Sequence, residues 1–153
     1  MANLSETELK VFIDAVTNYF SQLTRESAVV RSSYLAETEM PHYDYTGLIT
    51  LSGHFRGCVY FSAPRRLVRE LLIQLQEPDT CDENLLDAVG EVANTISGNA
   101  RRHFGSALDI SVPITIKGAT EQIKSAIQTR PFAILLTWQR YEAVVVVDLQ
   151  PAS

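Results

Sequence analysis

Residues 82–104 read DENLLDAVGEVANTISGNARRHF, and the apolar spacing in this stretch predicts one long helix that ends at Gly105. On a helical wheel, one narrow sector collects the larger apolar side chains, with two alanines beside them: Leu85, Val89, Val92 and Ile96, then Ala93 and Ala100. This sector predicts the face that packs on the core. Thr80 and Glu83 have the spacing of a capping box, which predicts where the helix begins.

The opposite side of this helix carries a polar stripe. Asp87, Glu91, Asn94 and Gly98 follow one another at i, i+4, i+7 and i+11. The like charges of Asp87 and Glu91 cost a few tenths of a kcal/mol, and Gly90 and Gly98 each cost about 1 kcal/mol relative to alanine. Bare glycine backbone would let another surface approach closely. A solvated face with two tolerated glycines is the alternative, and the pattern alone does not separate the two.

The chain before this helix is expected to hold two helices and three strands. A first helix begins near Ser5, which has capping-box spacing with Glu8. Pro64 takes the first position of a second helix, and Pro78 breaks it. The strands are expected over residues 28–35, 47–52 and 57–62, and the last two form an antiparallel hairpin across 53–56.

After the long helix, the pattern predicts a strand over 109–116, an amphipathic segment over 119–128, and a second hairpin of 132–138 and 143–149 across 139–142. The two hairpins resemble one another, and each follows a helix and a further strand, which indicates an internal duplication. We therefore expect a single α+β domain over residues 1–153 with pseudo-twofold duplicated halves. Its sheet would be mixed or antiparallel, with about six strands and helices packed on it.

Composition excludes several classes of protein. A chain of 153 residues with 46% hydrophobic content is long enough to bury a real core. The net charge of -5 argues against a nucleic-acid binder, and the arginines at positions 65, 66, 69, 101 and 102 are interpreted as solvated helix surface. No apolar run long enough for a membrane span and no secretory signal is visible, so a cytoplasmic setting without membrane contact is expected.

The residues that usually bind metals do not form a pattern. Cys58 and Cys81 make no disulfide framework, which favours a reduced compartment. His42, His54 and His103 have no ligand spacing relative to one another or to the cysteines. No metal site is therefore expected.

The stretch DAVGEVANTISGNAR, residues 87–101, resembles the signature helix of the CheX-type chemotaxis phosphatases, relatives of CheC and FliY. The family pattern is an Asp or Ser, three residues, Glu, two residues and Asn, filled here by Asp87, Glu91 and Asn94. Gly98 and the asparagine after it also suit the CheX branch. The resemblance spans most of the chain, because an N-terminal helix, a strand and a Pro-started helix precede the signature helix as in the family. The first helix lacks a Glu-x-x-Asn, so one site per chain is expected.

The resemblance implies a protein phosphatase that hydrolyses the phospho-aspartate of a phosphorylated CheY-like response regulator. Asn94 would orient the in-line water, because an amide can both accept from and donate to it without adding charge beside the phosphoryl group. Glu91 would pair with the active-site lysine of the partner, and Asp87 and Gly98 would contribute to docking. The chain would bind no cofactor of its own, and the partner would supply Mg²⁺.

The family resemblance also implies a homodimer joined edge to edge through the sheet, with the final hairpin as the edge. The competing interpretation is a non-catalytic receiver-binding or flagellar adaptor module that uses the same helix face. Substitution of Asn94 separates the two, since a phosphatase would lose turnover and still bind. A small-molecule enzyme would need a cleft with convergent polar groups, and the sequence indicates none.

Overall fold

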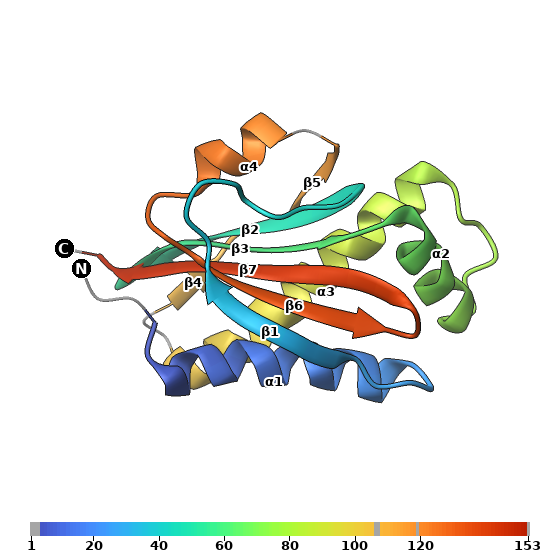
Figure 1. The fold of residues 1–153 in the computed structure, drawn as a ribbon, viewed down its shortest axis with the longest axis horizontal. Coiled ribbons are helices and arrows are strands. Elements are labelled where there is room, and N and C mark those ends of the chain that lie inside the picture. Colours follow the sequence, from blue (N-terminus) through green and yellow to red (C-terminus); the bar gives the residue numbers. More distant parts are fainter. Residues whose placement is uncertain (1–3, 106–107, 119, 153) are drawn as a thin grey trace.

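The computed structural model describes residues 4–105, 108–118 and 120–152. Four helices and seven strands lie in this part of the chain, as expected for an α+β fold (Figure 1). Their order is α1 (Glu6–Leu23), β1 (Val29–Leu35), β2 (Tyr45–Gly53), β3 (Phe55–Ala63), α2 (Arg65–Gln74), α3 (Asp82–Phe104), β4 (Leu108–Ile110), β5 (Ile114–Lys117), α4 (Thr120–Ala126), β6 (Phe132–Trp138) and β7 (Tyr141–Pro151).

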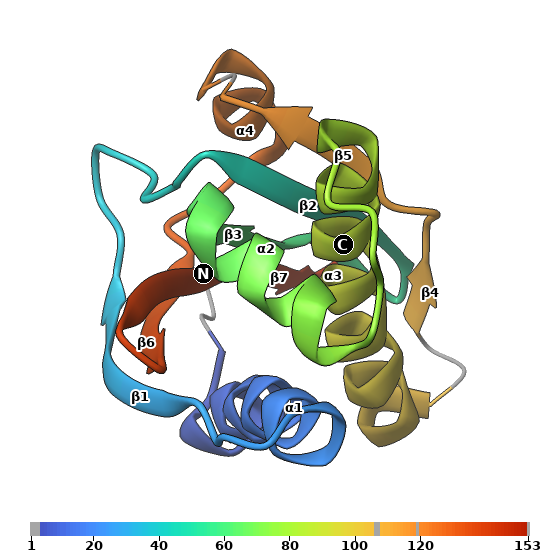
Figure 2. The ribbon, with the colours of Figure 1, turned by 90° about the vertical axis from the view of Figure 1, so that its right-hand side faces the viewer.

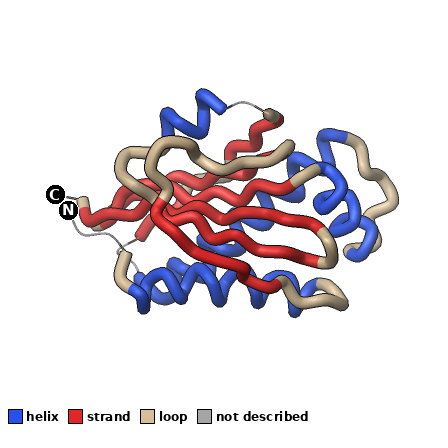
Figure 3. Tube along the Cα trace, viewed as in Figure 1, coloured by secondary structure: helices blue, strands red, loops and turns tan. Residues whose placement is uncertain are grey.

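The strands form one sheet, drawn in red in Figure 3. The sheet is antiparallel, with the strand order β1-β6-β7-β3-β2-β4 and β5 also paired to β2. The segment expected as one strand over 109–116 is two strands, β4 and β5, which raises the number from about six to seven. Pro113 lies between them and has no N–H to donate to a ladder. The long helix of the sequence prediction is α3, with the expected end at Gly105.

The strand order supports the internal duplication. The sheet has the same order of elements from either edge. An outer strand, β1 or β4, is followed by a hairpin, β6–β7 or β2–β3, whose second strand is central. The outer strand of each half pairs with the hairpin of the other half, since β1 pairs with β6 and β4 pairs with β2. Helix α1 precedes β1 as α3 precedes β4, so α2 and α4 are additions to the repeated pattern.

Helices cover the two faces of the sheet unequally. Helices α1 and α3 pack side by side on one face, where Phe20, Phe61 and Trp138 are fully buried. On the other face, α4 and the connection between β1 and β2 cover a smaller cluster that includes Tyr60 and Ile123. None of the helices in the described ranges is long and apolar enough to cross a membrane.

The helix ends follow the sequence signals in part. The Ser5–Glu8 capping box of α1 is confirmed, because each side chain accepts a bond from the other's backbone N–H. Pro64 is the N-cap of α2 and not its first helical residue. The helix ends at Gln74, before Pro78, because Gln76 adopts a positive φ of 65° and the following backbone N–H bonds back to Leu72.

The capping box expected for α3 is wrong. The N-cap is Cys81, and no side chain caps the helix there. The carboxylate of Asp79 instead accepts the backbone N–H of Cys81, so a local turn precedes the helix where Thr80 and Glu83 were expected to cap it. The expected amphipathic segment corresponds to α4, and its expected first residue, Ala119, lies outside the described residues.

Both hairpins form, with shorter turns than expected. Only His54 separates β2 from β3, and Gln139 and Arg140 separate β6 from β7. The interpretation of the final hairpin as a sheet edge is wrong, because β7 lies between β6 and β3 at the centre of the sheet and β6 lies between β1 and β7. The edges are β1 on one side and β4 with β5 on the other.

Candidate functional site

The structure places the four predicted site residues on the outer face of α3. Asp87 and Glu91 are exposed, and Asn94 and Gly98 are half-buried. The opposite face is fully buried in the core through Leu85, Val89, Val92 and Ile96. The division of this helix into a core face and a polar stripe therefore agrees with the periodicity of its sequence.

A glycine in the sheet fixes how closely α3 lies on β2. A Cβ atom at Gly47 would come within 2.3 Å of the carbonyl oxygen of Val89, so only glycine permits this approach. Thr115 of β5 is the register partner of Gly47 across the sheet. Helix α3 therefore crosses the paired residues Gly47 and Thr115 at Val89 and Gly90, which lie between Asp87 and Asn94 in the helix.

The prediction that Gly90 leaves bare backbone on the exposed side is wrong. Gly90 is buried, and a Cβ atom there would lie 3.0 Å from Cγ2 of Thr115 and 3.3 Å from Cβ of Pro113. The surface that approaches Gly90 belongs to this chain and not to a partner. At Gly98, in contrast, an added Cβ would meet no atom within 4 Å, so the helix is open there.

Two elements flank the polar stripe. At ~100° per residue, Asn94 falls about 20° from Asp87 toward Gly90, and Glu91 falls about 40° in the other direction. Asn94 is therefore turned toward residues 111–115, which we call the edge segment. Glu91 is turned toward α1, where burial, assisted by the charge of Glu91, raises the pKa of Tyr19 to about 12. Figure 2 shows α3 between β4 with β5 on one side and α1 on the other.

A polar groove continues the stripe toward the C-terminal end of α3. It lies between α1 and α3 and has a volume of ≈ 490 Å³. Asp14 and Asn18 line it from α1, and Asn99, Arg102 and His103 line it from α3. Asn99 is half-buried in this groove.

Charged side chains hold the N-terminal end of α3 in place. The carboxylate of Asp82 accepts hydrogen bonds from the Tyr45 hydroxyl at 2.6 Å and the Lys117 ammonium at 2.6 Å, and Arg65 lies 3.4 Å away. The bond from Lys117, then that from Tyr45, holds the pKa of Asp82 below its usual value. Three separate elements thus anchor the first residue of the helix, where an acidic side chain also complements the helix dipole.

The side chains on this face can take part in docking and hydrogen bonding. Within the described residues, no hydrogen bond engages the carboxylate of Glu91 or the amide of Asn94, so both are free for another molecule. A carboxylate can accept from a cation, and an amide can both donate and accept. No group of three or more His, Cys, Asp or Glu side chains among the described residues is placed to hold a metal.

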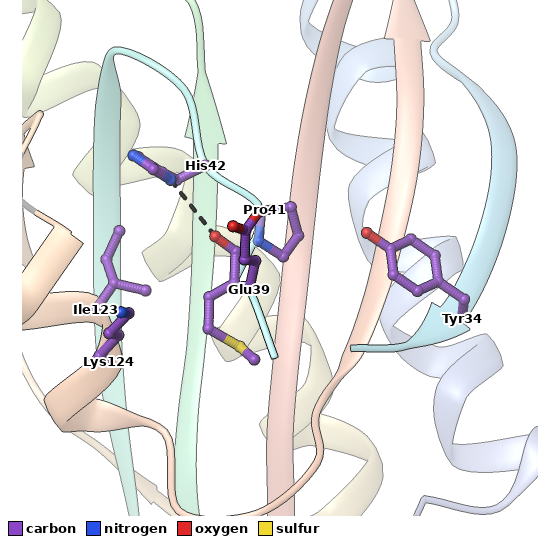
Figure 4. A pocket seen from close by; sticks show the side chains of 7 residues that line it. Tyr34, Glu39, Pro41, His42, Ile123 and Lys124 are labelled. Atoms are coloured by element: carbon purple, nitrogen blue, oxygen red, sulfur yellow. Dashed lines mark hydrogen bonds between the residues drawn. The ribbon is translucent and has the colours of Figure 1, made fainter. Parts of the chain in front are cut away.

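A separate cavity of ≈ 520 Å³ lies on the other face of the sheet (Figure 4). Tyr34 of β1, the connection from Glu39 to His42, and Ile123 and Lys124 of α4 line it. The imidazole Nδ1 of His42 lies 3.4 Å from the carbonyl oxygen of Met40, within its own loop. None of the residues in the polar stripe contributes to this cavity, so it is not part of the candidate site.

The same fold occurs in solved structures of chemotaxis proteins. CheX from Vibrio vulnificus has a TM-score of 0.81 at 19% identity, over 94% of this chain and 99% of that one. A putative chemotaxis protein from Desulfovibrio vulgaris Hildenborough has a TM-score of 0.81 at 23% identity, over 97% and 100% of the two chains. A CheX–CheY–BeF₃–Mg²⁺ complex from Borrelia burgdorferi has a TM-score of 0.74 at 18% identity, over 94% and 97%. The chain therefore shares the fold of these chemotaxis proteins.

The sequence identifies the family. Residues 45–137, more than half of the chain, match the family model of the chemotaxis phosphatase CheX. The chain therefore belongs to the CheX family. The matched range contains all of α3 and the edge segment. No curated protein sequence is detectably similar to the chain.

Proposed function

We propose that this protein hydrolyses the phospho-aspartate of a CheY-like response regulator, with Glu91 and Asn94 on the outer face of α3 as its catalytic pair. The observation that carries the proposal is their placement. They lie one turn apart on the same exposed stripe, with neither side chain engaged by the described residues. Membership of the CheX phosphatase family supports the reaction, and the residue roles follow from chemistry.

Asn94 orients the water that attacks the phosphorus. Phosphoryl transfer requires the attacking oxygen in line with the bond that breaks, so positioning is the main contribution a docking protein can make. The side-chain amide accepts a hydrogen bond from the water and adds no negative charge beside the phosphoryl oxygens. A carboxylate at position 94 would repel those oxygens.

Glu91 sets the register of docking by pairing with the active-site lysine of the receiver, and Asp87 and Gly98 add to the contact surface. The required Mg²⁺ belongs to the phosphorylated partner and not to this chain. The Borrelia burgdorferi complex that shares this fold contains CheX, CheY, BeF₃ and Mg²⁺, which supports a receiver as the partner.

The decisive experiment measures how long candidate receiver domains stay phosphorylated after loading with acetyl phosphate. Wild-type protein should accelerate the decay of one receiver. Asn94→Ala should reduce that acceleration by about a hundredfold or more while binding persists, because positioning is lost and docking is not. Glu91→Ala should weaken binding as well as turnover.

The same experiment separates the phosphatase from the adaptor. A receiver that binds wild-type protein and Asn94→Ala equally, with no acceleration by either, would contradict catalysis. It would leave a non-catalytic receiver-binding or flagellar adaptor module. Glu121→Gln is a suitable control, because Glu121 is an exposed residue of α4, which lies on the other face of the sheet.

We further propose a homodimer that joins two chains through the free edge of β1. Strand β1 has seven residues, against three in β4 and four in β5, so it offers the longer edge. Its partner β6 occupies one side only, and Val29 and Tyr34 are 48% and 41% exposed. Pairing a second copy along this strand would satisfy the free backbone groups.

A further inference from the structure

We propose that the edge segment, residues 111–115, is the second part of the docking surface and that Val112 contacts an apolar patch of the receiver domain. This inference rests on the proposed function, because the occupant is the receiver that brings its phospho-aspartate to Asn94. It adds an apolar contact to a site otherwise made of polar side chains.

The edge segment lies directly against the catalytic turn of α3. Pro113 and Thr115 pack on Gly90, with the close approaches described above, yet both remain exposed. They therefore form surface immediately beside the stripe and not a layer beneath it. Because Asn94 is turned toward this side of the helix, a molecule that reaches Asn94 comes up to the edge segment as well.

Hydrogen bonds hold the edge segment to the sheet. The backbone N–H of Ser111 donates to the carbonyl of Thr50 at 3.0 Å, and the N–H of Thr50 donates to Oγ of Ser111 at 2.9 Å. The Ser111 hydroxyl also donates to the carbonyl of Val112 at 2.9 Å. After Pro113, the ladder between β5 and β2 resumes at Ile114. A segment fixed at both ends presents Val112 in a defined position, which lowers the entropy cost of binding.

Val112 is the most exposed large apolar side chain in the described ranges, at 81%, and Ile114 beside it is 50% exposed. Residues 110–116 read ISVPITI and contain no charge. Val112 thus lies in a neutral apolar strip next to the acidic stripe of Asp87 and Glu91. Apolar contact supplies affinity where charged pairs supply orientation, so this combination fits a receiver with an apolar residue beside its acidic pocket.

The test measures both binding and turnover. Binding is measured with receiver domains loaded with BeF₃⁻ and Mg²⁺, and turnover with receiver domains phosphorylated by acetyl phosphate. Val112→Asp should raise the Kd of the receiver by about tenfold or more, because a charge replaces an apolar contact. Val112→Ser should raise it less. For both variants KM should rise with Kd while kcat stays near that of wild type, since both variants keep the side chains of Asn94 and Glu91.

Ile73→Asp provides the matched control. Ile73 is 50% exposed on α2, away from Gly90, so the same kind of substitution there should leave the Kd unchanged. Thermal unfolding of each variant checks that the fold is retained.

The outcomes separate this inference from the proposed function. Normal Kd and KM for Val112→Asp would overturn the docking role and leave the phosphatase intact. A receiver that binds wild type but is not dephosphorylated would contradict the phosphatase, and the Kd of Val112→Asp would still decide the role of the edge segment. If no receiver binds wild type, both proposals fail.

Discussion

Glycines with different surroundings show how single residues position the site. Gly47 has the backbone of α3 directly above it, and Gly90 has the edge segment beside it. Gly98 has open space around it. The sequence does not predict the surroundings of these glycines, because they depend on which segment far along the chain lies within contact distance.

Substituting alanine for these glycines should change stability in opposite directions. Gly47→Ala should lower the free energy of unfolding by about 1–3 kcal/mol or more, because its Cβ overlaps backbone atoms that can move only if α3 shifts. Gly98→Ala should raise it by up to about 1 kcal/mol, because alanine favours the helix and its Cβ meets no neighbour. Urea unfolding measures both. Equal effects of the two substitutions would contradict the surroundings described for them.

The ion pairs of Asp82 predict a specific pH dependence. The pKa of Asp82 is lowered from 3.8, so its stabilising effect is present above pH 3.8 and is lost as the pH falls through its folded-state pKa. The pKa of Lys117 is raised from 10.5, so its effect is present below pH 10.5 and is lost as the pH rises through its folded-state pKa. The Tm difference between wild type and Asp82→Asn should therefore be largest between these limits and shrink outside them.

Glu83→Gln serves as the control for this measurement. Glu83 shares the first turn of α3 but makes no ion pair among the described residues, so its substitution should leave the Tm nearly unchanged at every pH. A pH-independent difference for Asp82→Asn would mean that its carboxylate is not ion-paired in solution.

At the scale of elements, the sequence predicted those features of the fold that depend on contacts between near neighbours in the chain. The Ser5–Glu8 box and the Gly105 end of α3 were found in the sequence because each involves neighbours within one turn. The Thr80–Glu83 box failed because Asp79 fixes a competing turn, and Asp82 is held by residues more than ten positions away. The polar stripe followed from periodicity. Its flanking elements did not, because they depend on tertiary packing.

The edge segment shows the same limit. Its alternation of apolar residues predicted a single strand, and only Pro113 indicated an interruption. Nothing in the local pattern places this segment beside Gly90 or assigns Gly90 to an internal contact. The contact between Gly90 of α3 and Pro113 at the edge of the sheet becomes recognisable only once the strand order is known.

At the scale of the molecule, the free β1 edge leads to a prediction about assembly. Light scattering of wild-type protein should give twice the chain mass of 17.1 kDa. Val29→Glu combined with Tyr34→Glu should give the monomer mass, because like charges would face each other across the joined edge. Ile73→Glu with Leu75→Glu adds the same charges at exposed positions of α2 and its C-cap, and this variant should remain dimeric. A wild-type monomer would contradict the β1 dimer.

The exchange of outer strands between the two halves has a consequence for the origin of the chain. Since β1 lies against the hairpin of the second half and β4 and β5 against that of the first, neither half can complete its own sheet. Such an arrangement is what results when two copies of a short ancestor swap strands as a dimer and are later fused into one gene. A chain cut between α2 and α3 should accordingly give two fragments that are unfolded alone and reassemble when mixed.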